Sequence, residues 1–152
     1  PAGIALLDFL AIIIPHSSDL ITWHLGDQGF NMHLSGQVPR RISEALREEM
    51  NQAGANRLLH GEQVTDYDLW AIHPGGRTVL DAVETGLGLT ADDLDSSRRI
   101  LYNYGNMSSA TVMFVLQDML RLHCNHHHKA RGLAMAFGPG MVAETFRFQM
   151  AG

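Results

Sequence analysis

The chain has 152 residues, a formal net charge of −5, 45% apolar residues and 18% charged residues, a composition typical of one folded domain rather than of a disordered segment. The negative charge, without a basic stripe, argues against nucleic acid as the main partner, and a single cysteine excludes an internal disulfide framework and favours a reducing cytoplasm. The most apolar stretch, Ile4–Ile14, contains Asp8 and is too short to span a membrane, and no signal peptide is recognisable.

The first predicted element is a buried strand over Ile4–Ile14, because this isoleucine-rich run ends at the turn cluster Pro15–Ser18. A second, short strand is predicted over Phe30–Leu34, after Gly29. Since the chain starts at Pro1 directly before a core strand and without an initiator methionine, we expect it to be a truncated form of a longer protein.

Pro39 favours the opening of a helix, because its fixed φ suits the first turn and its missing N–H is not needed there. The apolar residues expected on one face of this helix are Ile42, Ala45, Leu46 and Met50. The following stretch, Asn51–Gln63, is polar and predicted to be irregular.

The next predicted unit is a strand, a tight turn and a helix. The strand covers Tyr67–Ile72, and His73–Gly76 forms the turn. The helix covers Arg77–Gly86, with Gly86 as its C-cap. The residues expected to face the core are Trp70 and Ile72 on the strand and Val79, Leu80 and Val83 on the helix.

Two further helices are predicted in the second half of the chain. Thr90 with Asp93 is a pattern typical of a capping box, and it starts a helix that ends near Tyr104. Asn106–Ser109 opens another helix that runs to about Leu122. Its apolar residues cover most of the circumference, which predicts a buried helix.

The last predicted elements are two strands, Gly132–Phe137 and Met141–Met150, joined at a turn over Gly138–Gly140. In the second strand, Phe146, Phe148 and Met150 alternate with Arg147 and Gln149, as the period of a strand requires. Strands and helices therefore alternate and end in an antiparallel hairpin. The pattern predicts an α/β fold with a mixed sheet flanked by helices, one of them buried.

Three motifs occur in a characteristic order and spacing: Trp70–Gly76, Tyr104–Ser109 and Phe137–Gly140. Together they resemble the signature of type III polyketide synthases, the chalcone and stilbene synthase-like family, and Pro15–Leu34 followed by Val38-Pro39 resembles the family segment before its catalytic histidine. The resemblance implies a thiolase-like fold built from two duplicated α/β units. Residues 1–152 would form the carboxy-terminal unit, and the amino-terminal half would be absent.

The resemblance also implies catalytic residues, because the family uses a Cys-His-Asn set. Its histidine corresponds to His73 and its asparagine to Asn106, whereas its cysteine lies in the absent half. The cysteine carries the growing acyl chain as a thioester, and the two other residues donate hydrogen bonds to the oxygen that becomes negative when malonyl-CoA loses CO₂. The simpler alternatives are a histidine that bonds its own turn and an asparagine that caps a helix.

Further residues would contact the substrate by the same resemblance. Met32 stands where plant chalcone synthases have a gatekeeping phenylalanine, and Trp23 stands where they have a glycine. A bulky indole would shrink or reshape the cavity, which favours a bacterial-type member with another starter, unless Trp23 simply packs in the core. The other expected substrate contacts are Gly75, Gly76 and Thr78 in the pantetheine tunnel, and Ser108, Phe137, Gly138, Pro139 and Gly140 in the cavity wall.

The expected activity is acyl transfer: a decarboxylative Claisen condensation of malonyl-CoA onto an acyl-CoA starter. Coenzyme A thioesters would be the substrates, with no cofactor, and the full-length enzyme would be a cytoplasmic homodimer that binds neither nucleic acid nor membrane. The chain alone is expected to be inactive, because it lacks the nucleophilic cysteine. The alternatives are a ketoacyl synthase III-like condensing enzyme and a non-catalytic half-domain that pairs with a partner subunit.

The segment His123–Lys129 contains Cys124 and four histidines. Nothing around Cys124 resembles the family's nucleophile segment. Imidazole and thiolate ligands suit zinc, nickel or copper, but a variable surface loop is the preferred interpretation, and no metal site is predicted.

Overall fold

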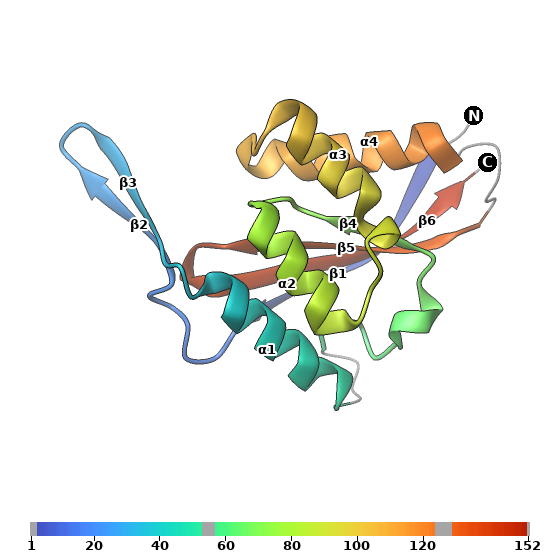
Figure 1. The fold of residues 1–152 in the computed structure, drawn as a ribbon, viewed down its shortest axis with the longest axis horizontal. Coiled ribbons are helices and arrows are strands. Elements are labelled where there is room, and N and C mark those ends of the chain that lie inside the picture. The colour runs from blue at the N-terminus through green and yellow to red at the C-terminus, as the bar shows by residue number, and fades with distance from the viewer. Residues whose placement is uncertain (1–2, 53–56, 124–128, 152) are drawn as a thin grey trace.

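The computed structural model describes residues 3–52, 57–123 and 129–151. These described residues form six strands and four α-helices, with short 3₁₀ helices between some of them (Figure 1). The elements are β1 (Gly3–Ile13), β2 (Ile21–Gly26), β3 (Gly29–Leu34), α1 (Val38–Met50), η1 (Val64–Asp66), β4 (Leu69–Ile72), α2 (Arg77–Leu87), η2 (Asp92–Leu94), α3 (Asp95–Tyr104), η3 (Ser108–Ala110), α4 (Thr111–His123), β5 (Arg131–Gly138), η4 (Pro139–Met141) and β6 (Val142–Ala151).

The main sheet has four strands in the order β1-β6-β5-β4. β6 pairs antiparallel with both β1 and β5, and β5 pairs parallel with β4. A parallel pair needs a long connection, which here contains α2, α3 and α4. The predicted α/β fold with a mixed sheet and a final antiparallel hairpin is confirmed.

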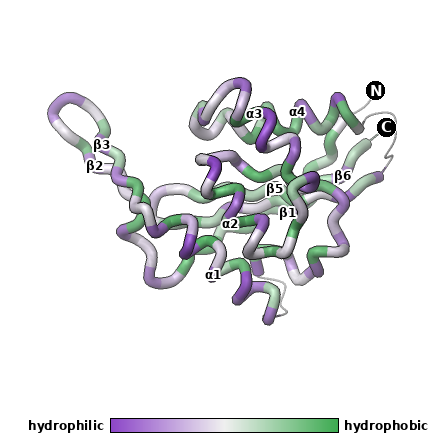
Figure 2. Tube along the Cα trace, viewed as in Figure 1, coloured by the Kyte–Doolittle hydropathy of each residue, from purple (hydrophilic) through white to green (hydrophobic). Residues whose placement is uncertain are grey.

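Helices cover both faces of this sheet (Figure 1). One core contains residues of α1 and α2 together with Trp70 and Ile72, and the other contains residues of α3 and α4 together with Leu69 and Ala71. Successive side chains of a strand point to opposite faces, so the short β4 supplies both cores. Figure 2 shows hydrophobic residues in green on the strands of the main sheet, and hydrophilic residues in purple on the helices and at the tip of the β2–β3 hairpin.

β1 is an edge strand, and the prediction that it is buried was wrong. Leu6, Phe9 and Ile13 are 54%, 68% and 67% exposed. The register pairs Leu6 with Phe148 and Phe9 with Phe146, which places these residues on the α4 side of the sheet. The core on that side reaches β1 only at Ile4, which packs against it, so Leu6, Phe9 and Ile13 face solvent in this chain.

The strand predicted over Phe30–Leu34 is half of a hairpin whose first strand, β2, was missed. β2 and β3 pair in direct register from Ile21 with Leu34 to Gly26 with Gly29, and they form a separate two-stranded sheet. The hairpin extends away from the main body at one end of the molecule (Figure 1). Its exposed hydrophobic side chains are Trp23, Leu25, Phe30, Met32 and Leu34.

Two predictions for α1 and α2 need correction. Met50 is exposed, and Glu49 is the buried residue at that end of α1, where its carboxylate accepts a hydrogen bond from the N–H of Leu59 at 3.3 Å. Gly86 lies inside α2, and the C-cap is Gly88, with a positive φ of 68°. Gly86 is needed for packing instead, because a Cβ there would lie 2.9 Å from the Cβ of Leu46 on α1.

Half of the predicted capping box is present, before η2: Asp93 Oδ2 accepts hydrogen bonds from the N–H and the hydroxyl of Thr90 at 2.7 and 2.8 Å, whereas the N–H of Asp93 donates to the Thr90 carbonyl and not to its side chain. The helix after α3, α4, is buried on one face only. That face presents Val115, Leu116 and Met119 to the sheet, and the opposite side leaves Met113, Phe114 and Leu122 exposed.

Within the part of the chain that the structure describes, no helix is both long and apolar enough to cross a membrane.

Candidate active site

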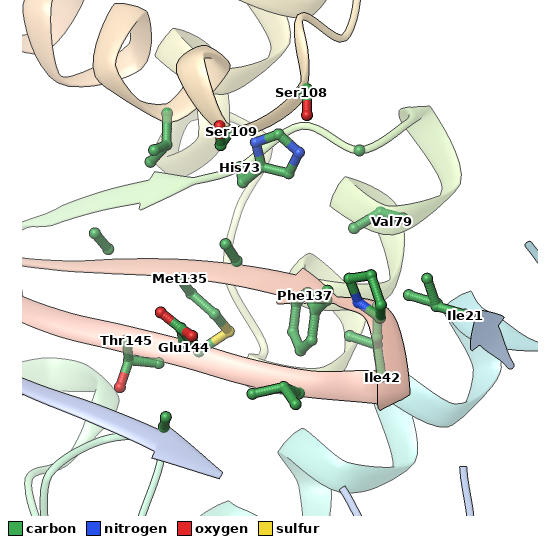
Figure 3. Close-up of a pocket in the computed structure, with 18 of the residues that line it drawn as sticks. Ile21, Ile42, His73, Val79, Ser108, Ser109, Met135, Phe137, Glu144 and Thr145 are labelled. Carbon is green, nitrogen blue, oxygen red and sulfur yellow. The ribbon is translucent and has the colours of Figure 1, made fainter. Parts of the chain in front are cut away.

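A cavity of about 850 Å³ opens where β4 ends, beside the β5–β6 turn and the base of the β2–β3 hairpin. The size and the location of this cavity are typical of ligand sites, because polar groups from loops and strand ends project into it between apolar side chains. His73, Asn106, Ser108 and Ser109 contribute polar groups to its lining. Figure 3 shows the His73 ring beside Ser108 and Ser109, with Phe137 and Glu144 across the cavity.

His73 follows β4 directly and continues its pairing with β5. Its N–H donates to the carbonyl of Met135 at 2.8 Å, and its own carbonyl accepts from the N–H of Gly75 at 2.9 Å. The backbone on both sides of the ring is therefore fixed. The side chain is half-buried, and burial lowers the pKa of His73, which favours the neutral imidazole.

A buried serine on α3 holds the strand end that carries His73. β4 is an edge strand, so its outer backbone groups have no neighbouring strand. Ser97, fully buried, donates from Oγ to the carbonyl of Ile72 at 2.7 Å and accepts from the N–H of Ile72 at 3.2 Å. Sequence reasoning missed Ser97, because this contact joins segments 25 residues apart.

The amide of Asn106 connects the turn after His73 to the helix that follows Asn106. Its Nδ2 donates to the carbonyl of Gly75 at 3.1 Å, and its Oδ1 accepts from the N–H of Ser108 at 2.9 Å. Both polar ends of the side chain are therefore held. The contact with Ser108, at the start of the following helix, resembles the helix cap that was the simpler alternative for Asn106. A primary amide carries a second N–H, which can donate to a ligand in the cavity.

Ser108 has a positive φ of 61°, an uncommon backbone conformation for a residue other than glycine. The hydroxyl of Thr111 stabilises this segment, because it accepts from the N–H of Met107 at 2.8 Å and donates to the carbonyl of Ser108 at 2.7 Å. Thr111 is fully buried. The start of α4 therefore presents Asn106 and Ser108 to the cavity from a fixed backbone.

The structure brings most of the expected site residues to this cavity and leaves three outside its lining. Gly76 and Thr78 lie at the start of α2, where Thr78 is exposed, and Gly140 lies in the β5–β6 turn with a φ of 74°. The expected residues that do line the cavity are Trp23, Met32, His73, Gly75, Asn106, Ser108, Phe137, Gly138 and Pro139.

A second wall of the cavity, from β1 and β6, was missed by sequence reasoning. It includes Phe9, Ala11, Glu144 and Phe146. Phe9 opposes Phe146 and Ala11 opposes Glu144, so each pair shares a face of the sheet. Only the register of two strands far apart in the sequence could have revealed this wall.

The described residues contain no group of three or more His, Cys, Asp or Glu side chains that could hold a metal ion. The segment 124–128, with Cys124 and three of the histidines for which metal binding was weighed, lies outside the described residues.

Comparison with protein families gives a match over nearly the whole chain. The model of the family described as "Chalcone and stilbene synthases, C-terminal domain" matches residues 7–151. A protein of Bacillus subtilis (strain 168) named "Putative chalcone synthase" is 34% identical over 145 residues, which make up 94% of this chain and 38% of that protein. The chain thus spans about two fifths of the length of this relative.

Solved structures share the same fold. The crystal structure of PKS-I from the brown alga Ectocarpus siliculosus superimposes with a TM-score of 0.82 and 29% identity, over 96% of this chain and 39% of that one. CsyB, solved in complex with CoA-SH, gives a TM-score of 0.82 at 24% identity, over 96% of this chain and 40% of its own. At that identity the second likeness concerns the fold alone.

Proposed function

Because this chain belongs to the chalcone and stilbene synthase family, as its C-terminal domain, we propose that it forms the histidine- and asparagine-bearing half of a type III polyketide synthase. The reaction would be the decarboxylative condensation of malonyl-CoA onto an acyl-CoA starter. The observation that supports the proposal is that His73 and Asn106 line one cavity, with the backbone of His73 and the side-chain amide of Asn106 each held by two hydrogen bonds.

The proposed roles follow from the chemistry of decarboxylation. When the malonyl thioester loses CO₂, negative charge develops on the thioester oxygen, and donors already aimed at that oxygen stabilise it. A neutral His73 has one N–H to donate, and Asn106 has the amide N–H that Gly75 does not use. Removing one such donor typically costs about 10²–10³ in rate.

The proposed condensation also needs a thiolate to carry the acyl chain. We infer that this group comes from an amino-terminal α/β unit and not from Cys124, because nothing near Cys124 resembles the nucleophile segment of the family. The chain alone would then bind a thioester without turning it over, and the complete enzyme would be the unit to assay.

The test mixes this chain with a cysteine-bearing amino-terminal unit from the Bacillus subtilis relative. Decarboxylation of malonyl-CoA is then measured by the release of CO₂ and of free CoA. We expect turnover from the mixture only, and a fall of about 10²–10³ in His73→Ala and in Asn106→Ala. His24→Ala is the matched control, since His24 lies on the hairpin and outside the cavity lining.

Equal turnover in His73→Ala and in the unsubstituted chain would refute the proposed role of this histidine. Turnover by the pure chain that disappears in His73→Ala would instead show that the thiol lies within these 152 residues, and Cys124→Ser would then identify it.

A further inference from the structure

Charged and polar side chains gather on one face of the β1–β6 pair, and we call them the Asp8 cluster: Asp8, His60, Glu62, Thr145 and Arg147. Arg147 makes a two-pronged contact with the Asp8 carboxylate, with Nε–Oδ1 and Nη2–Oδ2 distances of 2.7 Å, and its Nη1 donates to Glu62 at 2.8 Å. Such paired contacts fix geometry as well as adding energy. The cluster therefore joins β1, β6 and the loop that precedes β4.

His60 is the member that joins the two strands through a buried ring. Its Nδ1 lies 3.4 Å from Asp8 Oδ2, its Nε2 lies 2.9 Å from the hydroxyl oxygen of Thr145, and its side chain is 5% exposed. A carboxylate only accepts hydrogen bonds, so a neutral ring carries its proton on Nδ1 and accepts from Thr145 with Nε2. One side chain thus holds a residue of β1 and a residue of β6.

The cluster lies next to an irregularity in the pairing of β1. Leu6 opposes Phe148 and Asp8 opposes Arg147, so Leu7 has no partner on β6. Two residues of one strand facing one residue of the other are a β-bulge. After the bulge, Phe9 opposes Phe146, and their rings lie 5.4 Å apart in the cavity wall.

The bulge decides which residues of β1 reach the cavity, because a shift of one residue moves every side chain to the other face of a sheet. In a regular register Asp8 would oppose Phe146 on the apolar face. Phe9 would then oppose Thr145 and turn away from the cavity wall. The bulge itself does not prevent this slip. It leaves Leu7 without a partner on β6, whereas the regular register would pair that residue.

We propose that the Asp8 cluster is a positioning device that holds β1 in its bulged register and thereby places Phe9 against Phe146 in the wall of the cavity. The Asp8–Arg147 contact is satisfied only in that register, and His60 keeps Asp8 at a fixed distance from Thr145. The inference concerns the shape of the cavity and holds whatever reaction takes place there, so its test is independent of the proposed condensation.

An Asp–His–Thr sequence of contacts also occurs in hydrolytic triads, where the hydroxyl is the nucleophile. Thr145 is 2% exposed, and it precedes Phe146 on the strand, so its side chain points to the face opposite that aromatic residue. Thr145 contributes to the cavity lining, but its hydroxyl is held by His60 at 2.9 Å on the face opposite Phe146. The arrangement therefore positions the strands.

The experiment measures strand register by disulfide crosslinking in a Cys124→Ser background, since Cys124 is the single cysteine of the chain. The reporter pair is Phe9→Cys with Phe146→Cys, after the bulge, and the control pair is Ile4→Cys with Met150→Cys, before it; both pairs oppose each other directly. Each pair is oxidised alone and together with Asp8→Ala, His60→Ala or Arg147→Lys. Lysine keeps the charge but cannot make the two-pronged contact.

We expect Asp8→Ala and His60→Ala to slow crosslinking of the reporter pair about tenfold relative to the control pair, because each removes a partner of a buried polar group. Arg147→Lys, which keeps the positive charge and loses the two-pronged contact, should slow it about threefold. The rate of the reporter pair is divided by the rate of the control pair in each variant whose control pair still crosslinks. If this ratio is unchanged in Arg147→Lys and in all the other variants of this kind, the proposal is overturned.

Discussion

Burial favours the neutral form of two histidines, His60 and His73. Desolvation lowers the pKa of both below the ordinary value of 6.5, although the nearby Asp8 carboxylate works in the opposite direction for His60. Arg147 adds to the lowering at His60, and Glu62 opposes it. In the unfolded chain both rings take up protons near pH 6.5, so below this pH the unfolded state binds more protons than the native one.

The stability that these two histidines contribute is therefore complete above about pH 6.5 and is lost as the pH falls toward their lowered native pKa values. We expect the free energy of unfolding, measured with urea between pH 7.5 and 5, to decrease with falling pH. His60→Gln and His73→Gln should each reduce this slope, with the exposed His24→Gln as the control. A slope that neither substitution changes would show that the two rings are not the source.

Trp23 narrows the cavity from the hairpin, and its ring lies 5.4 Å from that of Phe30, edge to face. We predict that Trp23→Ala lets the assembled enzyme form larger products, identified by mass spectrometry, because the cavity gains the volume of an indole. Phe30→Ala removes the same ring contact, but Phe30 is not part of the cavity lining. If both variants gave the same new products, the flexibility of the hairpin would explain the change better than the volume of Trp23.

Among the helices, α1 and α2 pack closely at a single glycine. A methyl group on Gly86 would lie 2.9 Å from the Cβ of Leu46 and 3.2 Å from the backbone of Ser43. Neither contact is the end of a flexible side chain, so the helices would have to separate. We expect Gly86→Ala to destabilise the chain by about 1–3 kcal/mol, despite the better helix propensity of alanine.

Thermal and urea unfolding of Gly86→Ala would measure this cost, with Gly36→Ala as the matched control, because a Cβ at Gly36 meets no atom within 4 Å. A Gly86→Ala chain as stable as the unsubstituted one would mean that α1 and α2 can move apart freely.

Sequence patterns predicted the elements whose signals are local. The helix at Pro39 and the strand-turn-helix around His73 depend on neighbouring residues, and both are present, as is the contact of Asp93 with the N–H of Thr90. The same reasoning predicted β1 as buried, because hydrophobicity alone does not show whether a strand is central or at an edge. It also missed the wall formed by Phe9 and Phe146, since that wall depends on a bulged register between the two ends of the chain.

At the scale of the whole molecule, apolar side chains are exposed on the side of the sheet that carries α4. They include Leu6, Phe9 and Ile13 on β1 and Met113 and Phe114 on α4. Exposed apolar surface of this kind marks an interaction site or favours aggregation. We predict that the pure chain associates as its concentration rises, and that the double substitution Phe9→Ser with Met113→Ser weakens this association.

Sedimentation velocity across a range of concentrations would measure the effect, with Leu25→Ser on the hairpin tip as the control for a general gain in polarity. A chain that sediments as a monomer at every concentration would show that these residues do not drive association.

The unpaired Leu7 has a consequence for the evolution of this family. Every other residue of β1 from Gly3 to Ile13 opposes a residue of β6, so a deletion of Leu7 alone would close the bulge without moving any side chain to the other face. A deletion of a later residue would instead turn part of the strand to the other face, either the residues that follow it or, if the bulge closes, those between Leu7 and the deletion. Lineages can therefore gain or lose one codon at this position while they keep the same cavity, and homologous sequences should show their single-residue gaps here and not farther along the strand.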